Sequence, residues 1–132
     1  MNKREIKFRV WDKNKKTMIN FEEIERIDFT DKTIIVGGYI NFEDIEFMQY
    51  IGLKDKDGIE IYEGDILINT NKSKLNLGMD NQKYLVVYKA LGFDLKSLFK
   101  GIALKFDYSD LKKIGNIYEN PELLNEGGIC LI

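Results

Sequence analysis

The fold of this chain is decided by residues 48–68, which read MQYIGLKDKDGIEIYEGDILI. Two strand-like runs, Met48–Leu53 and Ile59–Ile68, flank the polar segment Lys54–Gly58. Apolar and β-branched residues on both sides of a short segment that ends in Asp-Gly are typical of a β-hairpin. The stretch therefore predicts two antiparallel strands joined by a tight loop.

The register of this hairpin follows from the side chains that would face each other. A three-residue loop ending at Gly58 places Lys54 opposite Glu60 and Leu53 opposite Ile61, pairing charge with charge and apolar with apolar. A two-residue turn would instead set Lys54 against Ile61. The longer loop also gives Gly58 the left-handed backbone that such loops need. We therefore predict the three-residue loop.

Gly64 interrupts the second run between two acidic residues, Glu63 and Asp65. Glycine inside a strand pattern usually marks a bulge or a close approach of another backbone. In a continuous strand, Glu63 and Asp65 would share one face. We predict a structural role for Gly64 and take the segment Glu63-Gly64-Asp65 as a candidate interaction surface.

Further out, short alternating or apolar runs predict additional strands. They are Ile6–Val10, Met18–Phe21, Ile24–Phe29, Thr33–Val36, Tyr84–Tyr88, Phe93–Leu98, Ile102–Phe106 and Ile114–Tyr118. Residues 30–32 read as a hairpin loop, although Phe21, Ile24 and Ile27 also fit helical spacing. The acidic segment Phe42–Phe47 is ambiguous between helix and strand.

Two other segments are not strands. The polar stretch Asn69–Gln82 predicts a long loop. Asn120 followed by Pro121 and Glu122 predicts a short helical turn, because asparagine caps helices and proline suits the first helical position. The predicted fold is mainly β: a small β-roll or SH3-like barrel with extra N-terminal strands and a short C-terminal helical turn.

Composition excludes several classes of function. The 132 residues suit one domain, with a possible division into an N-terminal β part, 1–47, and a roll, 48–128. The absence of histidine excludes Ser-His-Asp and Cys-His catalysis and any His-ligated metal. The single cysteine, Cys130, cannot form an internal disulfide and fits a reducing cytoplasm. No apolar run approaches the ~20 residues that span a bilayer, so we expect no membrane contact.

Charge is strongly polarised, although the net charge is only −2. Residues 1–16 carry seven basic and two acidic side chains, and residues 21–65 carry four basic and thirteen acidic ones. Lys7, Arg9 and Trp11 alternate with apolar residues and form a basic, aromatic face. This face could follow a nucleic-acid backbone, could prevent edge-to-edge aggregation, or could pair with the acidic region of another subunit. The near-neutral total favours the last two.

The acidic residues of the middle stretch are candidates for a metal-binding or acid–base site. Asp57, Glu60, Glu63 and Asp65 supply carboxylates, yet no phosphate-binding loop or nucleophile accompanies them. A calcium loop aligned on Gly58 fails, because leucine and glycine occupy two of its ligand positions. We predict no catalytic, cofactor-binding or metal-binding residue.

Three segments together resemble one protein family. They are REIKFRVWD at residues 4–12, MQYIGLKDKDGIEIYEGDI at residues 48–66, and IGNIYENPELL at residues 114–124. In this order the chain resembles the YopX family of small phage and prophage proteins. The resemblance implies a mainly-β structure with an SH3-like roll around the middle motif, and expression in the cytoplasm of a bacterial host. It supplies no catalytic or binding residues, and it leaves self-assembly as an expectation.

These observations lead to two hypotheses of function. The first is a non-enzymatic phage accessory protein that forms homo-oligomers and binds a host or phage protein through Lys7, Arg9, Trp11 and Glu63-Gly64-Asp65. The alternative is a nucleic-acid-binding accessory that uses the basic N-terminal strand and the loop lysines Lys72 and Lys74.

Overall fold

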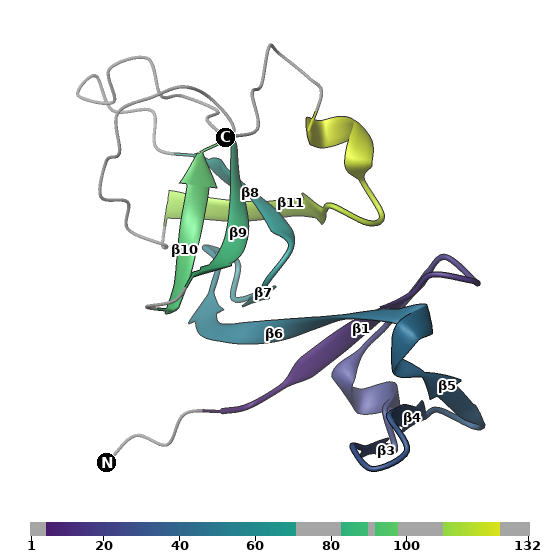
Figure 1. Ribbon diagram of the computed structural model, residues 1–132. Coiled ribbons are helices and arrows are strands. Elements are labelled where there is room, and N and C mark those ends of the chain that lie inside the picture. The colour runs from purple at the N-terminus through teal and green to yellow at the C-terminus, as the bar shows by residue number, and fades with distance from the viewer. Residues whose placement is uncertain (1–4, 71–82, 90–91, 98–109, 125–132) are drawn as a thin grey trace. The chain divides into compact units, whose positions relative to one another are not determined.

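The computed structural model describes residues 5–70, 83–89, 92–97 and 110–124 (Figure 1). The chain forms two compact units, residues 1–50 and 51–132, and the boundary between them lies inside one strand. Eleven strands and three short 3₁₀ helices lie in the described ranges, and no helix there is longer than four residues. The mainly-β class predicted from the sequence is confirmed.

The elements are short, as the frequent turn residues of the sequence require. The strands are β1 (Phe8–Asp12), β2 (Thr17–Ile19), β3 (Arg26–Asp28), β4 (Thr33–Ile35), β5 (Tyr39–Asn41), β6 (Ile45–Lys54), β7 (Glu60–Tyr62), β8 (Asp65–Asn69), β9 (Lys83–Lys89), β10 (Gly92–Ser97) and β11 (Leu111–Asn116). The 3₁₀ helices are η1 (Phe21–Glu23), η2 (Phe42–Asp44) and η5 (Pro121–Leu124).

Unit 1, residues 1–50, contains two small sheets. Strand β1 lies between β2 and β6 and is antiparallel to both. Strands β3, β4 and β5 form a separate antiparallel sheet in sequence order. Val10, Ile19, Ile34 and Ile45 are buried together and form the core of the unit. Each such side chain contributes about 1.5–3 kcal/mol when fully buried.

The aromatic residues of unit 1 extend this core toward the surface. Phe8 meets Phe47 edge to face, with ring centroids 6.4 Å apart, and Phe47 meets Phe42 at 5.1 Å. Phe42 in turn meets Phe29 at 6.0 Å, and the Phe29 side chain is 75% exposed. Edge-to-face pairs are favourable because the positive ring edge meets the negative ring face. The row of rings therefore runs from half-buried residues to an exposed one.

Unit 2, residues 51–132, is built around a curled half-barrel sheet with strand order β10-β9-β8-β11 (Figure 1). Strand β7 pairs with the end of β6. Ile61, Leu67, Tyr84, Val86 and Leu111 form its buried core. Strand β9 shows alternating burial. Tyr84 and Val86 are buried, whereas Leu85 and Val87 are half-buried.

The predicted three-residue loop of the β6–β7 hairpin is confirmed. Asp55 donates its backbone N–H to the carbonyl of Ile59 at 2.8 Å, and Gly58 donates to the carbonyl of Asp55 at 3.0 Å. These bonds close a three-residue loop at residues 56–58. Gly58 has a φ of +80°, the left-handed conformation expected of it.

Several sequence-based boundaries were wrong. The run Ile59–Ile68 is two strands, because Glu63 and Gly64 form a turn between β7 and β8. The strand expected at 114–118 is β11, which ends at Asn116 and starts three residues earlier than predicted. The strand expected at 18–21 ends at Ile19 and is followed by η1. The ambiguous segment 42–47 divides into η2 and the start of β6.

Some predicted features lie outside the described residues. They are most of the loop 69–82 with Lys72 and Lys74, the strand expected at 102–106, and Cys130. The predicted helical turn after Asn120 is confirmed as η5.

The turn after β11 is organised by two asparagines. The Asn116 carboxamide oxygen accepts the backbone N–H groups of Tyr118 and Glu119 at 3.0 and 2.8 Å. The Asn120 carboxamide oxygen accepts the Asn116 N–H at 3.2 Å. Asn120 lies directly over Gly115, where an added Cβ would be 2.5 Å from the Asn120 oxygen. Glycine at position 115 is therefore needed for the Asn120 contact.

Gly115→Ala should lower the free energy of unfolding by about 1–3 kcal/mol, because the new methyl group overlaps Asn120. Chemical denaturation measures the change, and Gly38→Ala is the control because a Cβ at Gly38 meets nothing within 4 Å. In an Asn120→Gly background, Gly115→Ala should lower the free energy of unfolding by much less, because the side chain that the new methyl group overlaps is gone. Equal costs in both backgrounds would contradict this account.

Candidate functional site

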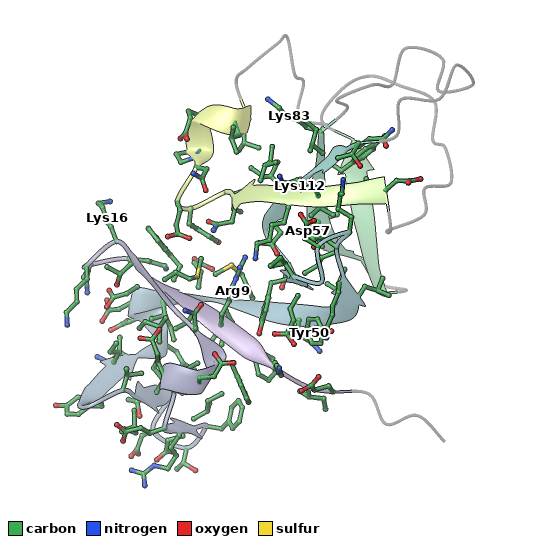
Figure 2. The ribbon with its side chains drawn as sticks, turned by 180° about the vertical axis from the view of Figure 1, so that it is seen from behind. Arg9, Lys16, Tyr50, Asp57, Lys83 and Lys112 are labelled. Carbon is green, nitrogen blue, oxygen red and sulfur yellow. The ribbon has the colours of Figure 1, made fainter. Side chains whose placement is uncertain are left out.

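The N-terminal candidates Lys7, Arg9 and Trp11 lie on or beside β1 in unit 1, and Figure 2 labels Arg9. Lys7 is half-buried, with its Nζ 3.2 Å from a Glu5 carboxylate oxygen and 5.9 Å from the centre of the Tyr50 ring. Arg9 is buried, with 4% of its surface exposed, and Trp11 is half-buried. The positive charge of this strand is thus largely withdrawn from the surface.

Exposed lysines of unit 1 lie at the β1–β2 turn, where Figure 2 labels Lys16. Lys13 pairs with Glu46, its Nζ lying 3.1 Å from the carboxylate oxygen. Lys15 and Lys16 are exposed and form no ion pair within the described residues. The turn itself is held by Asp12, whose carboxylate accepts the backbone N–H groups of residues 14 and 15 at 2.9 and 3.0 Å.

The second candidate segment, Glu63-Gly64-Asp65, lies in unit 2. The backbone N–H of Gly64 donates to the carbonyl of Val86 at 2.9 Å, and its carbonyl accepts the N–H of Ile117 at 3.0 Å. Strand β9 and the turn after β11 are therefore both hydrogen-bonded to this glycine. Gly64 has a φ of +88°. The predicted structural role of Gly64 is confirmed, although it lies in a turn and not in a strand.

Asp65 is completely buried and belongs to the interior of unit 2. Its Oδ2 accepts the backbone N–H of Tyr62 at 2.7 Å and lies 3.1 Å from the Nζ of Lys113. Glu63 is half-buried and does not share a strand face with Asp65, because the chain turns between them. Of this segment, only Glu63 presents part of a charged side chain at the surface.

Lys113 connects two carboxylates of the middle stretch to β11. Its Nζ pairs with Asp65, and its backbone N–H donates to the Oδ2 of Asp55 at 2.9 Å. The other oxygen of Asp55 accepts the N–H groups of Asp57 and Ile59 at 2.8 and 2.9 Å. Sequence reasoning missed both Asp55 and Lys113. An aspartate that opens a turn is a known signal for Asp55, whereas nothing local identifies Lys113.

The environment of Asp55 determines its protonation. Burial alone would raise the pKa of its carboxyl group, because burial penalises the charged form. The backbone N–H groups of Lys113, Ile59 and Asp57, together with the Lys113 charge, act in the opposite direction and hold this pKa below its usual value. The folded protein therefore favours the ionised carboxylate.

The carboxylates considered for metal binding are not gathered into a site. Asp57 is exposed in the β6–β7 loop, labelled in Figure 2, whereas Asp65 is buried beside Lys113. Within the described ranges, no group of three or more Cys, Asp or Glu residues is placed to hold an ion. In the same part of the chain, no helix is long and apolar enough to cross a membrane.

Asp55→Asn should destabilise the protein at neutral pH by about 1.5–3 kcal/mol, because charged acceptors make the stronger hydrogen bonds. The folded pKa of Asp55 is lowered, so its stabilising effect is complete well above 3.8 and is lost as the pH falls through the lower folded value. The difference in unfolding free energy between wild type and variant should therefore shrink in acid. Urea titrations across the acid range measure it, with the exposed Asp57→Asn as control. A constant difference would argue against this role.

Gly64→Val should reduce the unfolding free energy by about 1–3 kcal/mol, because a β-branched residue is strained at this positive φ. Gly38→Val is the matched control, since its φ is ordinary and its surroundings are open. Equal denaturation midpoints for the two variants would show that the Gly64 conformation has no energetic importance.

Comparisons with known proteins agree with this architecture. The family model described as YopX protein matches residues 7–125. The crystal structure of protein EF1440 from Enterococcus faecalis is similar, with a TM-score of 0.69 and 28% sequence identity over 92% of this chain and 99% of that chain. No curated protein matches the sequence. Because the family match spans most of the chain, the protein belongs to the YopX family.

Proposed function

We propose that this protein is a non-enzymatic, phage- or prophage-encoded accessory protein of the bacterial cytoplasm that self-associates and binds another protein. The way the chain uses its charged groups supports this proposal. Asp55 and Asp65 accept backbone N–H groups, and both contact Lys113. Asp65, one of the carboxylates considered as a reactive group, and Asp55 therefore hold the hairpin and β11 together.

Exposed apolar side chains provide the observation that carries the proposal. Ile6, Phe29 and Tyr39 are 62%, 75% and 74% exposed, and all three belong to unit 1. Single exposed apolar residues are common, but aromatic side chains are enriched where proteins meet. Unit 1 thus offers contact area to a partner.

The nucleic-acid alternative has less support. Lys7 is paired with Glu5, and Arg9 is buried. Two of the three candidate nucleic-acid-binding residues of the N-terminal segment are therefore not fully exposed to a ligand. A fluorescence-polarisation titration with single- and double-stranded DNA and RNA at low salt tests it directly. Binding that falls steeply as salt is raised would favour this alternative over the proposal.

Light scattering after size exclusion should give a mass above that of one chain, rising with protein concentration. The self-association should persist at moderate salt, because apolar contact is insensitive to screening. Affinity purification from phage-infected cells should retain a specific partner. A single-chain mass at every concentration, with no partner retained, would overturn the proposal.

A further inference from the structure

Strand β3 forms one edge of the three-stranded sheet of unit 1 (Figure 1). It consists of Arg26, Ile27 and Asp28, which pair in that order with Ile35, Ile34 and Thr33 of β4. Arg26 is exposed, and Ile27 and Asp28 are half-buried. An edge strand presents backbone donors and acceptors to a further strand.

The backbone directions in this sheet can be assigned from bonds on the β5 side. Lys32 accepts the N–H of Phe42 at 2.8 Å, and Val36 donates to the carbonyl of Gly38 at 2.7 Å. Bonding alternates along an antiparallel ladder, so the even-numbered residues of β4 bond toward β5. The odd-numbered residues, Thr33 and Ile35, bond toward β3.

The partner of Thr33 on β3 is Asp28, whose backbone groups therefore point into the sheet. Ile35 is the partner of Arg26, and its carbonyl also accepts the backbone N–H of Glu25 at 2.9 Å, so the ladder is irregular at this end. The backbone N–H and C=O of Ile27 point the opposite way, outward from an edge at which no strand of the described ranges is paired. A second β3, antiparallel and related by a two-fold axis at Ile27, would exchange both hydrogen bonds with it. This is the arrangement of a hydrogen-bonded antiparallel pair.

The charges of β3 are self-complementary in this register. Arg26 of one copy would lie opposite Asp28 of the second copy, and the symmetry axis repeats the pair. Both are non-hydrogen-bonded positions, where facing side chains approach most closely. Asp28 uses Oδ1 to accept the N–H groups of Thr30 and Asp31, and its Oδ2 makes no hydrogen bond within the described residues. That oxygen can accept from arginine.

Other arrangements of the same edge are unfavourable. Parallel pairing would bring arginine beside arginine and aspartate beside aspartate. A shift by one residue would set a charged side chain opposite Ile27 and move apolar residues to the other face. The opposite edge of the sheet, β5, carries Tyr39, Ile40 and Asn41 and has no charge to select a register.

We infer that two copies of this chain associate through β3, paired antiparallel about Ile27, so that their three-stranded sheets become one six-stranded sheet. The inference rests on the proposed self-association and names its surface. Phe29 follows β3 directly and is 75% exposed, so a second copy at this edge would cover part of it.

The test exchanges charges between copies. Arg26→Asp gives a chain with two acidic side chains on this edge, and Asp28→Lys gives one with two basic side chains. Each alone should weaken self-association at least about tenfold, because two opposite-charge pairs become like-charge pairs. An equimolar mixture of the two variants should associate again as a heterodimer. Sedimentation velocity over a concentration series, with one variant fluorescently labelled, measures both effects.

Lys15→Asp is the matched control for Arg26→Asp, since it makes the same charge change at an exposed position of unit 1. Circular dichroism must show that each variant is folded, and the double variant Arg26→Asp/Asp28→Lys should self-associate because it restores opposite charges. If wild type associates and the single variants do so equally, the β3 contact is wrong and self-association stands. If Lys15→Asp has the larger effect, the β3 contact is also wrong. If wild type is monomeric at all concentrations, the β3 contact and the proposed self-association both fail.

Discussion

The roll of unit 2 depends on the two carboxylates that meet at Lys113. A buried carboxylate such as Asp65 is strongly destabilising unless it is paired and hydrogen-bonded. The lysine ammonium and the Tyr62 N–H satisfy Asp65, while the lysine backbone N–H satisfies part of Asp55. Because the two aspartates lie on either side of β7, one residue of β11 fixes both ends of that strand. Loss of either interaction would leave a polar group buried without its partner.

The same chemistry shapes the turns throughout the chain. Asp12, Asp28, Asp55 and Asn116 each accept two backbone N–H groups from residues that follow within four positions. Short polar side chains of this kind replace missing backbone hydrogen bonds where the chain reverses. Three acidic side chains, those of Asp12, Asp28 and Asp55, are thus committed to holding loops.

Local features could be predicted from the sequence because their causes are local. The loop ending at Gly58 follows from charge pairing between residues six apart, and the turn after Asn120 follows from capping. The break at Gly64 was missed because two strands joined by a two-residue turn show the same apolar pattern as one. The burial of Arg9 was missed because alternation shows which residues share a face and not what covers it. Lys113 was missed because its bond to Asp55 spans 58 positions.

The position of β1 has a consequence for synthesis of the protein. Its hairpin partner β2 follows at once, but its other neighbour, β6, begins only at residue 45. During synthesis, the edge of β1 that pairs with β6 in the folded protein therefore has no hydrogen-bonding neighbour until β6 has been made. Arg9 lies on β1 and Lys7 directly precedes it, and such charges oppose premature pairing between nascent chains. The basic N-terminal residues can thus protect the newly made chain before they become part of the folded one.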